Sequence, residues 1–424
     1  VVELAPTRYG TKAGVAVVAD SWWQAKQALG ALTIRWSPSP HVSLDSAAIN
    51  VQLRTAAAGN DGLPFRSYGD AQGIIEQSTR THDATYEAPY LAHATMEPMN
   101  ATVRVGKDRA EVWTGTQVVG PARSAVAHTL GVATEHVTVH QSSIGGGFGR
   151  RLEVDYVVQA AQIAQAMPGV AVQTIWSRED DLQHDFYRPA SVTRLRAALD
   201  ASGAVASIVT QSAGQSPFKS LSARLGIPFA GNVPDKTTAE GLFDQPYEFP
   251  ALRSAHTEVE LPVPVGSWRS VGHSHQAFFF ESFLDELAHI AKVDPVEYRR
   301  QLLGKHPRAR AVLDAVAKAS AWGSPLPPAS DGAALARGVA FHSSFSTAAA
   351  AVATVSLDLD RRVRVHEVVV AIDCGLAVNP NGIRQQVEGS VMFALQAALH
   401  GNVPIEGGRA RVSNFSDYRP LRMS

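Results

Sequence analysis

Residues 143–151 read Ser143-Ile144-Gly145-Gly146-Gly147-Phe148-Gly149-Arg150-Arg151. This stretch lies between a strand-like run at 136–140 and a helix-like run that begins near Leu152. Glycines at such a turn allow left-handed backbone angles and let the backbone approach a ligand closely. Unpaired amides at the start of the following helix favour an anion. The stretch predicts either a cradle for a phosphate-bearing cofactor or a tight packing turn followed by two solvated arginines. Its spacing matches neither the dinucleotide fingerprint GxGxxG nor a Walker A loop.

The composition is that of an ordinary globular protein, with 45% hydrophobic and 18% charged residues among 424. This length predicts about two or three domains. The net charge of −1 provides no basic field for nucleic acid. The single cysteine, Cys374, excludes a disulfide within this chain and any site in which several cysteines hold zinc or an iron–sulfur cluster.

No apolar run approaches the roughly 20 residues of a membrane span. The chain begins at Val1 without a signal-peptide pattern, and it stops at Ser424 with no helix or strand brought to a close. We therefore expect a fragment of a larger polypeptide.

The first 81 residues predict a βαβ-like start and a connector. A strand at 15–19, a helix around 22–29 and a return strand at 32–36 form the start. Residues 41–81 are polar, small and weakly patterned, which predicts a surface linker in which residues 46–57 could form a short helix.

Residues 82–101 contain two strand-like pieces around a segment dense in His, Met, Glu and Pro. This density is typical of an active-site wall. The alternative is a structural corner in which His93 and Glu97 bind buried backbone, and for His93 taken alone the corner is favoured.

The next segment alternates strands and helices, which predicts helices packed on a mixed sheet and an α+β fold. The expected strands are 110–114, 137–140 and 170–176, and the expected helices are 118–130 and 152–167. A charged loop at 178–188 and an alternating strand at 191–199 follow.

Residues 204–263 are irregular, with two expected strands at 207–212 and 256–260. Three helices are expected after them, at 277–291, 295–303 and 310–321. A turn at 338–346, a hairpin at 352–372 and a helix at 383–399 complete the predicted order. The helix at 277–291 is apolar over most of its surface, so its phenylalanines should lie in the core. The Pro- and Ser-rich stretch 323–331 is the predicted domain boundary.

Four side chains are local candidates for a site. Gln117 ends a strand and could aim its amide at a ligand, although the local pattern favours a hydrogen bond within the loop. His273 and His275 could bind a metal, but no cluster of further ligands accompanies them. Cys374 follows Asp373, which would raise the pKa of a thiol, so packing is the favoured role.

Several motifs in order together resemble one family, the molybdenum-binding large subunits of the xanthine dehydrogenase/aldehyde oxidase family. Within it the chain is most similar to the branch of isoquinoline 1-oxidoreductase beta subunits and membrane-associated aldehyde dehydrogenase large subunits. The motifs are Tyr86-Glu87-Ala88-Pro89, His93-Ala94-Thr95-Met96-Glu97-Pro98, Thr116-Gln117, Gly145 to Arg151, Trp268-Arg269-Ser270-Val271-Gly272, Glu281 to Ala288, Asp373-Cys374-Gly375 and Gln386-Val387-Glu388-Gly389.

The resemblance implies a fold of the molybdopterin-binding type and a molybdopterin cofactor, in the cytosine dinucleotide form common in bacterial members. It places Gly145, Gly146, Gly147, Phe148 and Gly149 beside the molybdenum. It gives Gln117 a hydrogen bond to an oxygen of the metal centre and puts Arg269 against the pterin or substrate. Ser344 and Gln386 would hold pterin and phosphate. The dithiolene of the pterin carries the metal, so no protein metal ligand is implied.

The implied chemistry is hydroxylation of an electron-poor carbon with water as the oxygen source and a glutamate base. Electrons would leave through 2Fe–2S clusters on a small partner subunit, with a cytochrome c as a candidate acceptor. The compartment is left open between the cytoplasm and the periplasm or membrane surface of a bacterium.

Two departures from the family follow from the residues. The family's glutamate base lies in a Gly-Glu loop that this chain does not reach, so the chain alone is expected to be inactive. Leu152 occupies the place of the purine-binding Glu, and Glu153 comes one residue later. An N-heteroaromatic compound or an aldehyde is therefore the expected substrate.

The predicted organisation is an N-terminal piece at 1–81, a first molybdopterin-binding domain at 82–323 and part of a second at 332–424. A catalytically incomplete or cofactor-free scaffold is the alternative function. A generic nucleotide-binding protein, with a phosphate but no pterin pocket behind the turn, is a third.

Overall fold

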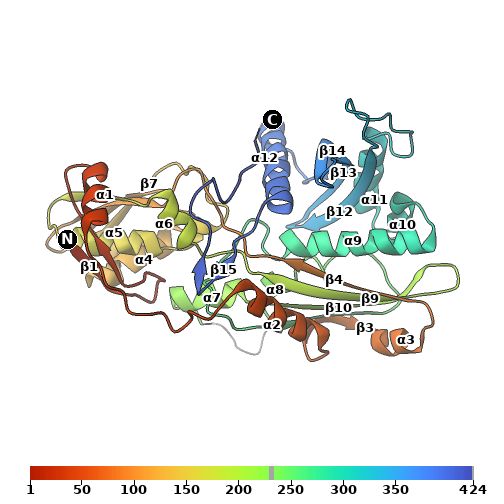
Figure 1. The fold of residues 1–424 in the computed structure, drawn as a ribbon, viewed down its shortest axis with the longest axis horizontal. Coiled ribbons are helices and arrows are strands. Elements are labelled where there is room, and N and C mark those ends of the chain that lie inside the picture. The colour runs from red at the N-terminus through yellow and green to blue at the C-terminus, as the bar shows by residue number, and fades with distance from the viewer. Residues whose placement is uncertain (229–233, 423–424) are drawn as a thin grey trace.

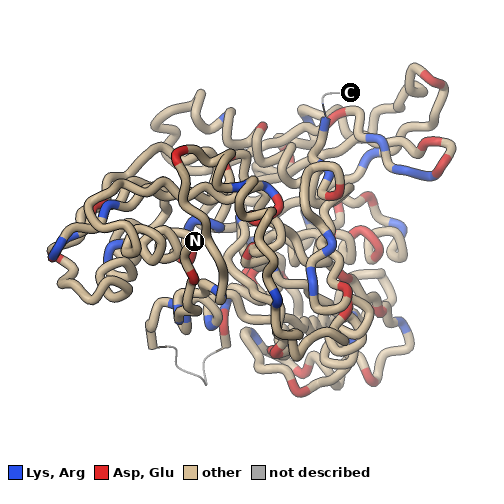
Figure 2. Tube along the Cα trace, turned by 60° about the vertical axis from the view of Figure 1, so that its left-hand side comes forward, with Lys and Arg blue, Asp and Glu red and all other residues tan. Residues whose placement is uncertain are grey.

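The computed structural model describes residues 1–228 and 234–422, so the last two residues of the predicted second domain lie outside the described part. Figure 1 shows one lobe built on a small sheet, a second lobe built on a long sheet, and helix α12 standing between them. Figure 2 shows acidic and basic residues interspersed along the chain. None of the described helices combines the length and apolarity needed to cross a bilayer.

The first lobe is a four-stranded sheet with the order β7-β6-β5-β8. The strands are β5 (Asn100–Val105), β6 (Ala110–Thr114), β7 (Val137–Gln141) and β8 (Ala171–Ile175). β6 and β7 are parallel, whereas β5 pairs antiparallel with β6 and β8. Helices α4 (Val119–Leu130) and α5 (Asp155–Gln165) pack on it through small side chains such as Ala160 and Ala161. The predicted mixed sheet with packed helices is confirmed.

The second lobe contains a five-stranded sheet with the order β3-β11-β10-β9-β4. Its strands are β3 (Leu63–Tyr68), β4 (Thr81–Ala88), β9 (Ser191–Leu199), β10 (Val205–Gly214) and β11 (Leu252–Glu258). Helix α9 (His273–Ala291) lies along this sheet and buries Phe279, Phe280 and Phe283 in the largest core cluster. Phe278 is 59% exposed, so the prediction that the phenylalanines of this helix lie in the core was wrong for Phe278.

A three-stranded antiparallel sheet follows, made of β12 (Ala336–Ser344), β13 (Thr347–Leu357) and β14 (Val363–Asp373). Helices α10 (Pro295–Leu302) and α11 (Pro307–Ala319) join it to α9. Helix α12 (Pro380–Leu399) has no buried side chain, unlike the other long helices of this lobe. Four short elements also belong to the part of the chain after β10: α7 (Pro217–Leu225), α8 (Lys236–Ala239), β15 (Ile405–Glu406) and β16 (Arg409–Ala410).

The predicted βαβ-like start is wrong. β2 (Gly14–Ala16) pairs antiparallel with β1 (Val2–Leu4), and α1 (Trp22–Ala31) buries no side chain. Residues 32–36 form no strand, because an alternating pattern gives a strand only where a neighbouring strand offers its backbone. The helix expected at 46–57 is confirmed as α2 (Ser46–Ala58). The rest of the surface-linker prediction for 41–81 was wrong, because the segment also contains β3 and α3 (Ala71–Gln77), and Ile49 and Leu53 of α2 are fully buried.

Two other local predictions were wrong. The charged loop at 178–188 begins with helix α6 (Arg178–Gln183), which Ser177 and Asp180 start as a capping box. The turn at 338–346 is mostly strand β12, which pairs with β13 along its whole length.

The two strands expected within 204–263 are present. β10 contains the expected run 207–212, and β11 overlaps the expected run 256–260 but begins four residues earlier. The two strands pair in parallel over seven residues.

Candidate functional site

The Gly-rich turn, residues 145–149, connects β7 to a 3₁₀ turn at Arg150–Leu152, and α5 starts only at Asp155. Three of its residues have positive φ: Gly146 at 99°, Phe148 at 54° and Gly149 at 108°. A Cβ on Gly149 would lie 1.6 Å from the carbonyl oxygen of Ser267. The turn therefore packs against the loop before α9, and only glycine fits at 149. A non-glycine residue with positive φ is often found at functional sites.

Arg151 links the turn to two neighbouring segments through hydrogen bonds. Its guanidinium is fully buried and donates to the carbonyls of Gly146 and Gly115 at 3.0 and 2.8 Å. It also pairs with the Glu97 carboxylate at 2.8 Å, and that carboxylate accepts from the Gly145 amide at 2.9 Å. Partial burial works against ionisation of Glu97, but hydrogen bonds from Asn100 and Gly145 and the charge of Arg151 lower its pKa.

Arg150 is also buried, but its partners are different ones: it makes two 2.8 Å hydrogen bonds to Asp155 and pairs with Asp185 at 3.2 Å. Burial opposes its charge, but Asp155 and Asp185 more than compensate and raise its pKa. Neither Arg150 nor Arg151 is solvated. The interpretation as two solvated arginines was therefore wrong, because Asp155 and Asp185 bind Arg150 and Glu97 binds Arg151 inside the protein.

His93 links the turn to the loop before α9. Its Nδ1 lies 2.9 Å from a carboxylate oxygen of Asp185, and its Nε2 lies 2.9 Å from the carbonyl oxygen of Ser267. A carbonyl oxygen and an ionised carboxylate only accept hydrogen bonds, so each ring nitrogen of His93 faces an acceptor. Burial acts against ionisation of Asp185, but the charge and hydrogen bond of His93 lower its pKa. His93 is thus a structural corner, as the local interpretation favoured.

Three segments meet on the exposed side of the turn, namely the turn itself, the loop before α9 and helix α12. Phe148 contacts Phe393 of α12, with ring centroids 4.6 Å apart, and Phe393 stacks on Trp268 at the same distance. The Arg269 guanidinium lies 5.9 Å from the Phe148 ring centre and donates to Ser390 Oγ at 2.7 Å. Its bond to Gln386 Oε1 is longer, at 3.4 Å. We call Phe148, Arg269, Gln386 and Phe393 the α12 cluster.

Gln117 lies beside this cluster. Its Oε1 accepts a hydrogen bond from the Gly149 amide at 3.1 Å, and the residue is exposed. No described residue accepts a hydrogen bond from its Nε2 in the structure. The loop hydrogen bond expected for Gln117 is therefore present, and a ligand contact through its amide nitrogen stays a prediction.

Ser344 is the predicted site residue that the structure does not join to the cluster. It ends β12, is half-buried, and makes no side-chain hydrogen bond within the described ranges. Its neighbour Phe345 contacts His273, the first residue of α9, with ring centroids 5.6 Å apart. The hairpin tip thus reaches the start of α9 rather than the Gly-rich turn.

Sequence reasoning missed Phe393 and Ser390. Both follow Gln386 on α12, at positions i+7 and i+4, and so lie on the face that carries Gln386. Helical spacing from a known candidate would have found them. Glu153, which stands one residue beyond the expected substrate-binding place, is buried and pairs with Arg224 through a 2.7 Å hydrogen bond. No group of three or more His, Cys, Asp or Glu side chains in the described part could hold a metal ion.

Asp181 of α6 gives the region a pH-dependent contribution to stability. It is 3% exposed, and burial together with the charge of Asp185 raises its pKa to about 6, although Arg178 pairs with it. A carboxyl with a raised folded pKa stabilises the fold below its unfolded pKa, about 3.9. That contribution is lost as pH rises through about 6.

We therefore expect the stability of the wild type relative to Asp181→Asn to fall as pH rises from about 4 to about 7. Thermal melting across this range measures it, with Asp61→Asn on the surface as the control. A difference between wild type and Asp181→Asn that stays level, or grows with pH, would refute this assignment.

The chain matches two family models described as the molybdopterin cofactor-binding domain, one over residues 58–303 and the other over 286–424. The chain belongs to this family, in its xanthine dehydrogenase/aldehyde oxidase type. The expected resemblance and fold type are thus confirmed.

Among individual proteins, the chain is 30% identical over 428 residues to isoquinoline 1-oxidoreductase subunit beta of Brevundimonas diminuta, covering 97% of this chain and 53% of that protein. It is 28% identical over 436 residues to a membrane-bound aldehyde dehydrogenase (pyrroloquinoline-quinone) of Gluconacetobacter polyoxogenes, covering 97% and 56%. The chain thus spans about half the length of these relatives. The structure of quinoline 2-oxidoreductase from Pseudomonas putida 86 shares the fold, with a TM-score of 0.76 at 13% identity over 96% of this chain and 76% of that one.

Proposed function

We propose that this chain forms the cofactor-binding part of a molybdenum hydroxylase that oxidises an aldehyde or an N-heteroaromatic compound, with water as the oxygen source. The observation that carries the proposal is the meeting of Gln117, the Gly-rich turn and the α12 cluster on one exposed surface. These segments lie far apart in the sequence, and structural packing alone does not require that a half-buried Arg and two exposed Gln side chains converge beside a strained turn.

The residues fit a molybdopterin. Arg269 has no carboxylate partner among the described residues. Its partial burial is therefore not offset by an opposite charge and lowers its pKa. A half-buried guanidinium without an acid suits the anionic groups of such a cofactor. Gln117 offers a free amide nitrogen, and the glycines keep side chains away from the turn. When bound, the cofactor supplies the metal and its two-electron redox chemistry.

Each residue then has a distinct role. Gly145 to Gly149 form a backbone wall beside the metal, with Phe148 as the side-chain contact. Gln117 donates a hydrogen bond to the cofactor, while Arg269 and Gln386 bind its pterin or phosphate groups. Ser344 remains a proposed contact of the second domain. The cofactor would be the cytosine dinucleotide form.

The proposal extends to partners. Electrons would pass to 2Fe–2S clusters on a small subunit, because the single cysteine cannot hold such a cluster here. The glutamate base would come from a loop outside these 424 residues. The isoquinoline and aldehyde relatives support the two substrate classes, and the interior pairing of Glu153 with Arg224 argues against a purine.

Metal analysis of the full-length protein, purified with its partner subunit, tests the proposal. Molybdenum near one atom per chain is expected, together with dye-coupled oxidation of members of an aldehyde and N-heterocycle panel. A complex without molybdenum would instead support the alternative, a cofactor-free scaffold.

Replacing Gln117 with leucine should lower turnover by about 100-fold, the usual cost of removing one preorganised donor at a reacting centre. Its fold should be nearly unchanged because the side chain is exposed. Steady-state kinetics and melting temperature, measured with Gln385→Leu on α12 as the control, separate the two effects. Wild-type turnover in Gln117→Leu would remove the residue from the site.

A further inference from the structure

Arg269 is the cation of the α12 cluster, and its side chain has one close polar contact. Its Nη2 donates to Ser390 Oγ at 2.7 Å, whereas the contact with Gln386 Oε1 is 3.4 Å long. An N–H···O hydrogen bond usually spans about 2.7–3.2 Å, so Ser390 is the stronger partner. The Nη1 and Nε atoms of Arg269 make no hydrogen bond with any described residue. Most of the donors of this guanidinium are therefore available to a ligand.

The aromatic contacts of Arg269 hold the guanidinium without fixing its direction. Its Cζ lies 5.9 Å from the ring centre of Phe148 and 5.8 Å from that of Phe393. A ring attracts the positive charge as a whole, so the attraction changes little when the guanidinium turns within its own plane. A hydrogen bond is directional and prefers a D–H···A angle above about 150°. The bond to Ser390 therefore decides where the unpaired nitrogens of Arg269 point.

Ser390 is itself held in one orientation by helix α12. Its hydroxyl donates to the carbonyl oxygen of Gln386, four residues earlier, at 2.6 Å. A hydroxyl has one proton and two lone pairs, so the proton is used within the helix and a lone pair faces Arg269. Hydrogen bonds in series strengthen one another. The two bonds thus connect the Arg269 guanidinium through Ser390 to the backbone of α12.

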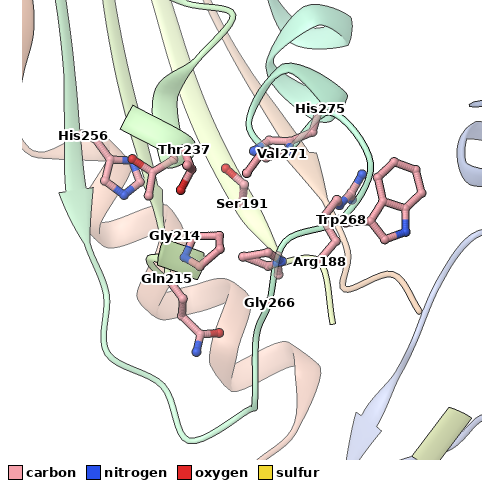
Figure 3. Close-up of a pocket in the computed structure, with 14 residues that line it drawn as sticks. Arg188, Ser191, Gly214, Gln215, Thr237, His256, Gly266, Trp268, Val271 and His275 are labelled. Atoms are coloured by element: carbon pink, nitrogen blue, oxygen red, sulfur yellow. The ribbon is translucent and has the colours of Figure 1, made fainter. Parts of the chain in front are cut away.

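The backbone of the loop that carries Arg269 is fixed separately, through Trp268. This residue is buried, and its indole nitrogen donates to the carbonyl oxygen of Ala92 at 3.3 Å. The Arg188 guanidinium lies 5.7 Å from the centre of the same indole, and Figure 3 shows the two side chains next to each other. Because these contacts anchor the loop, the freedom that remains lies in the side chain of Arg269.

We propose that Ser390 is a positioning residue that orients Arg269 toward an anionic group of the bound cofactor. The inference rests on the proposed function, because it takes the molybdopterin as the ligand of Arg269. A guanidinium N–H binds an anionic oxygen strongly only when the donor points at that oxygen. In this role Ser390 acts through Arg269 and makes no contact of its own with the cofactor or the substrate.

A purely structural role for Ser390 predicts a different result. Alanine favours a helix more than serine does, and α12 buries none of its side chains. Ser390→Ala should therefore leave the melting temperature of the protein nearly unchanged, while the side chain of Arg269 loses its closest partner. A lower melting temperature in Ser390→Ala would show that the serine stabilises the fold instead, and would count against the proposal.

Cofactor retention by the full-length protein, purified with its partner subunit, tests the proposal. Molybdenum and pterin are measured after timed incubation and desalting. Ser390→Ala should lose both roughly 10-fold faster than the wild type, as expected for the loss of one hydrogen bond to a charged group. Ser390→Thr keeps a hydroxyl and should restore wild-type retention. Ser37→Ala is the control, since Ser37 is exposed and makes no hydrogen bond in the described part of the chain.

A double-mutant cycle separates positioning from direct binding. Arg269→Met should speed cofactor loss by itself, and adding Ser390→Ala to it should change nothing further. Additive effects would mean that Ser390 binds the cofactor directly, and the positioning role would be wrong. Wild-type retention in Ser390→Ala would overturn it as well. A wild-type complex without molybdenum would instead overturn the proposed function, so the two failures are distinguishable.

Discussion

Gly149→Ala is expected to unfold at markedly lower urea concentration than the wild type, with a loss of at least about 3 kcal/mol. The new Cβ would lie 1.6 Å from the carbonyl oxygen and 2.6 Å from the carbonyl carbon of Ser267. Backbone atoms cannot move aside as a flexible side chain can. The residue also has a φ of 108°, which alanine rarely adopts.

Gly120→Ala is the matched control, since nothing lies within 4 Å of a Cβ at that position in helix α4. It should unfold at or slightly above the wild-type midpoint, because alanine favours a helix more than glycine does. If Gly149→Ala kept a wild-type midpoint, the close packing of the turn on the Ser267 loop would be wrong. If it folded with a displaced turn, the hydrogen bond to Gln117 would be lost, and turnover with it.

Arg150→Met should destabilise the protein by about 3–5 kcal/mol. The change leaves the carboxylates of Asp155 and Asp185 buried without the cation that binds both. Arg150→Lys should rescue little, because an ammonium cannot make the two parallel hydrogen bonds to Asp155. Urea unfolding at neutral pH measures both variants.

Arg364→Met serves as the control, because the Arg364–Asp331 pair is exposed on both sides and such pairs contribute little. It should unfold close to the wild type. A similar effect of Arg150→Met and Arg364→Met would mean that Arg150 does not anchor the turn. The charge of Arg150 lowers the pKa of Asp181, so its removal should raise that pKa further. A stronger loss of stability between pH 4 and 7 in Arg150→Met than in the wild type would therefore show that Asp181 and Arg150 act in one network.

The elements that local pattern predicted well share one property. Helices α4, α9 and α11 and strands β6, β7 and β9 carry their periodicity or end signals within a few residues. The elements it missed were decided by partners. Strand β12 forms because β13 lies beside it, whereas residues 32–36 have a strand-like pattern and no neighbouring strand.

The candidate site divides in the same way. The sequence by itself determined the position of the Gly-rich turn, the family resemblance and the candidates Gln117, Arg269 and Gln386, because motifs are local. Only the tertiary structure decided that Arg150 and Arg151 point inward and that Phe393 of α12 completes the cluster. A charged side chain is buried at low free-energy cost only where a group of opposite charge pairs with it, and an aromatic ring gains most from contact with another ring. Asp155 lies only five residues from Arg150, but Asp185, Glu97 and Phe393 lie in other segments of the chain, so no local pattern contains the whole set.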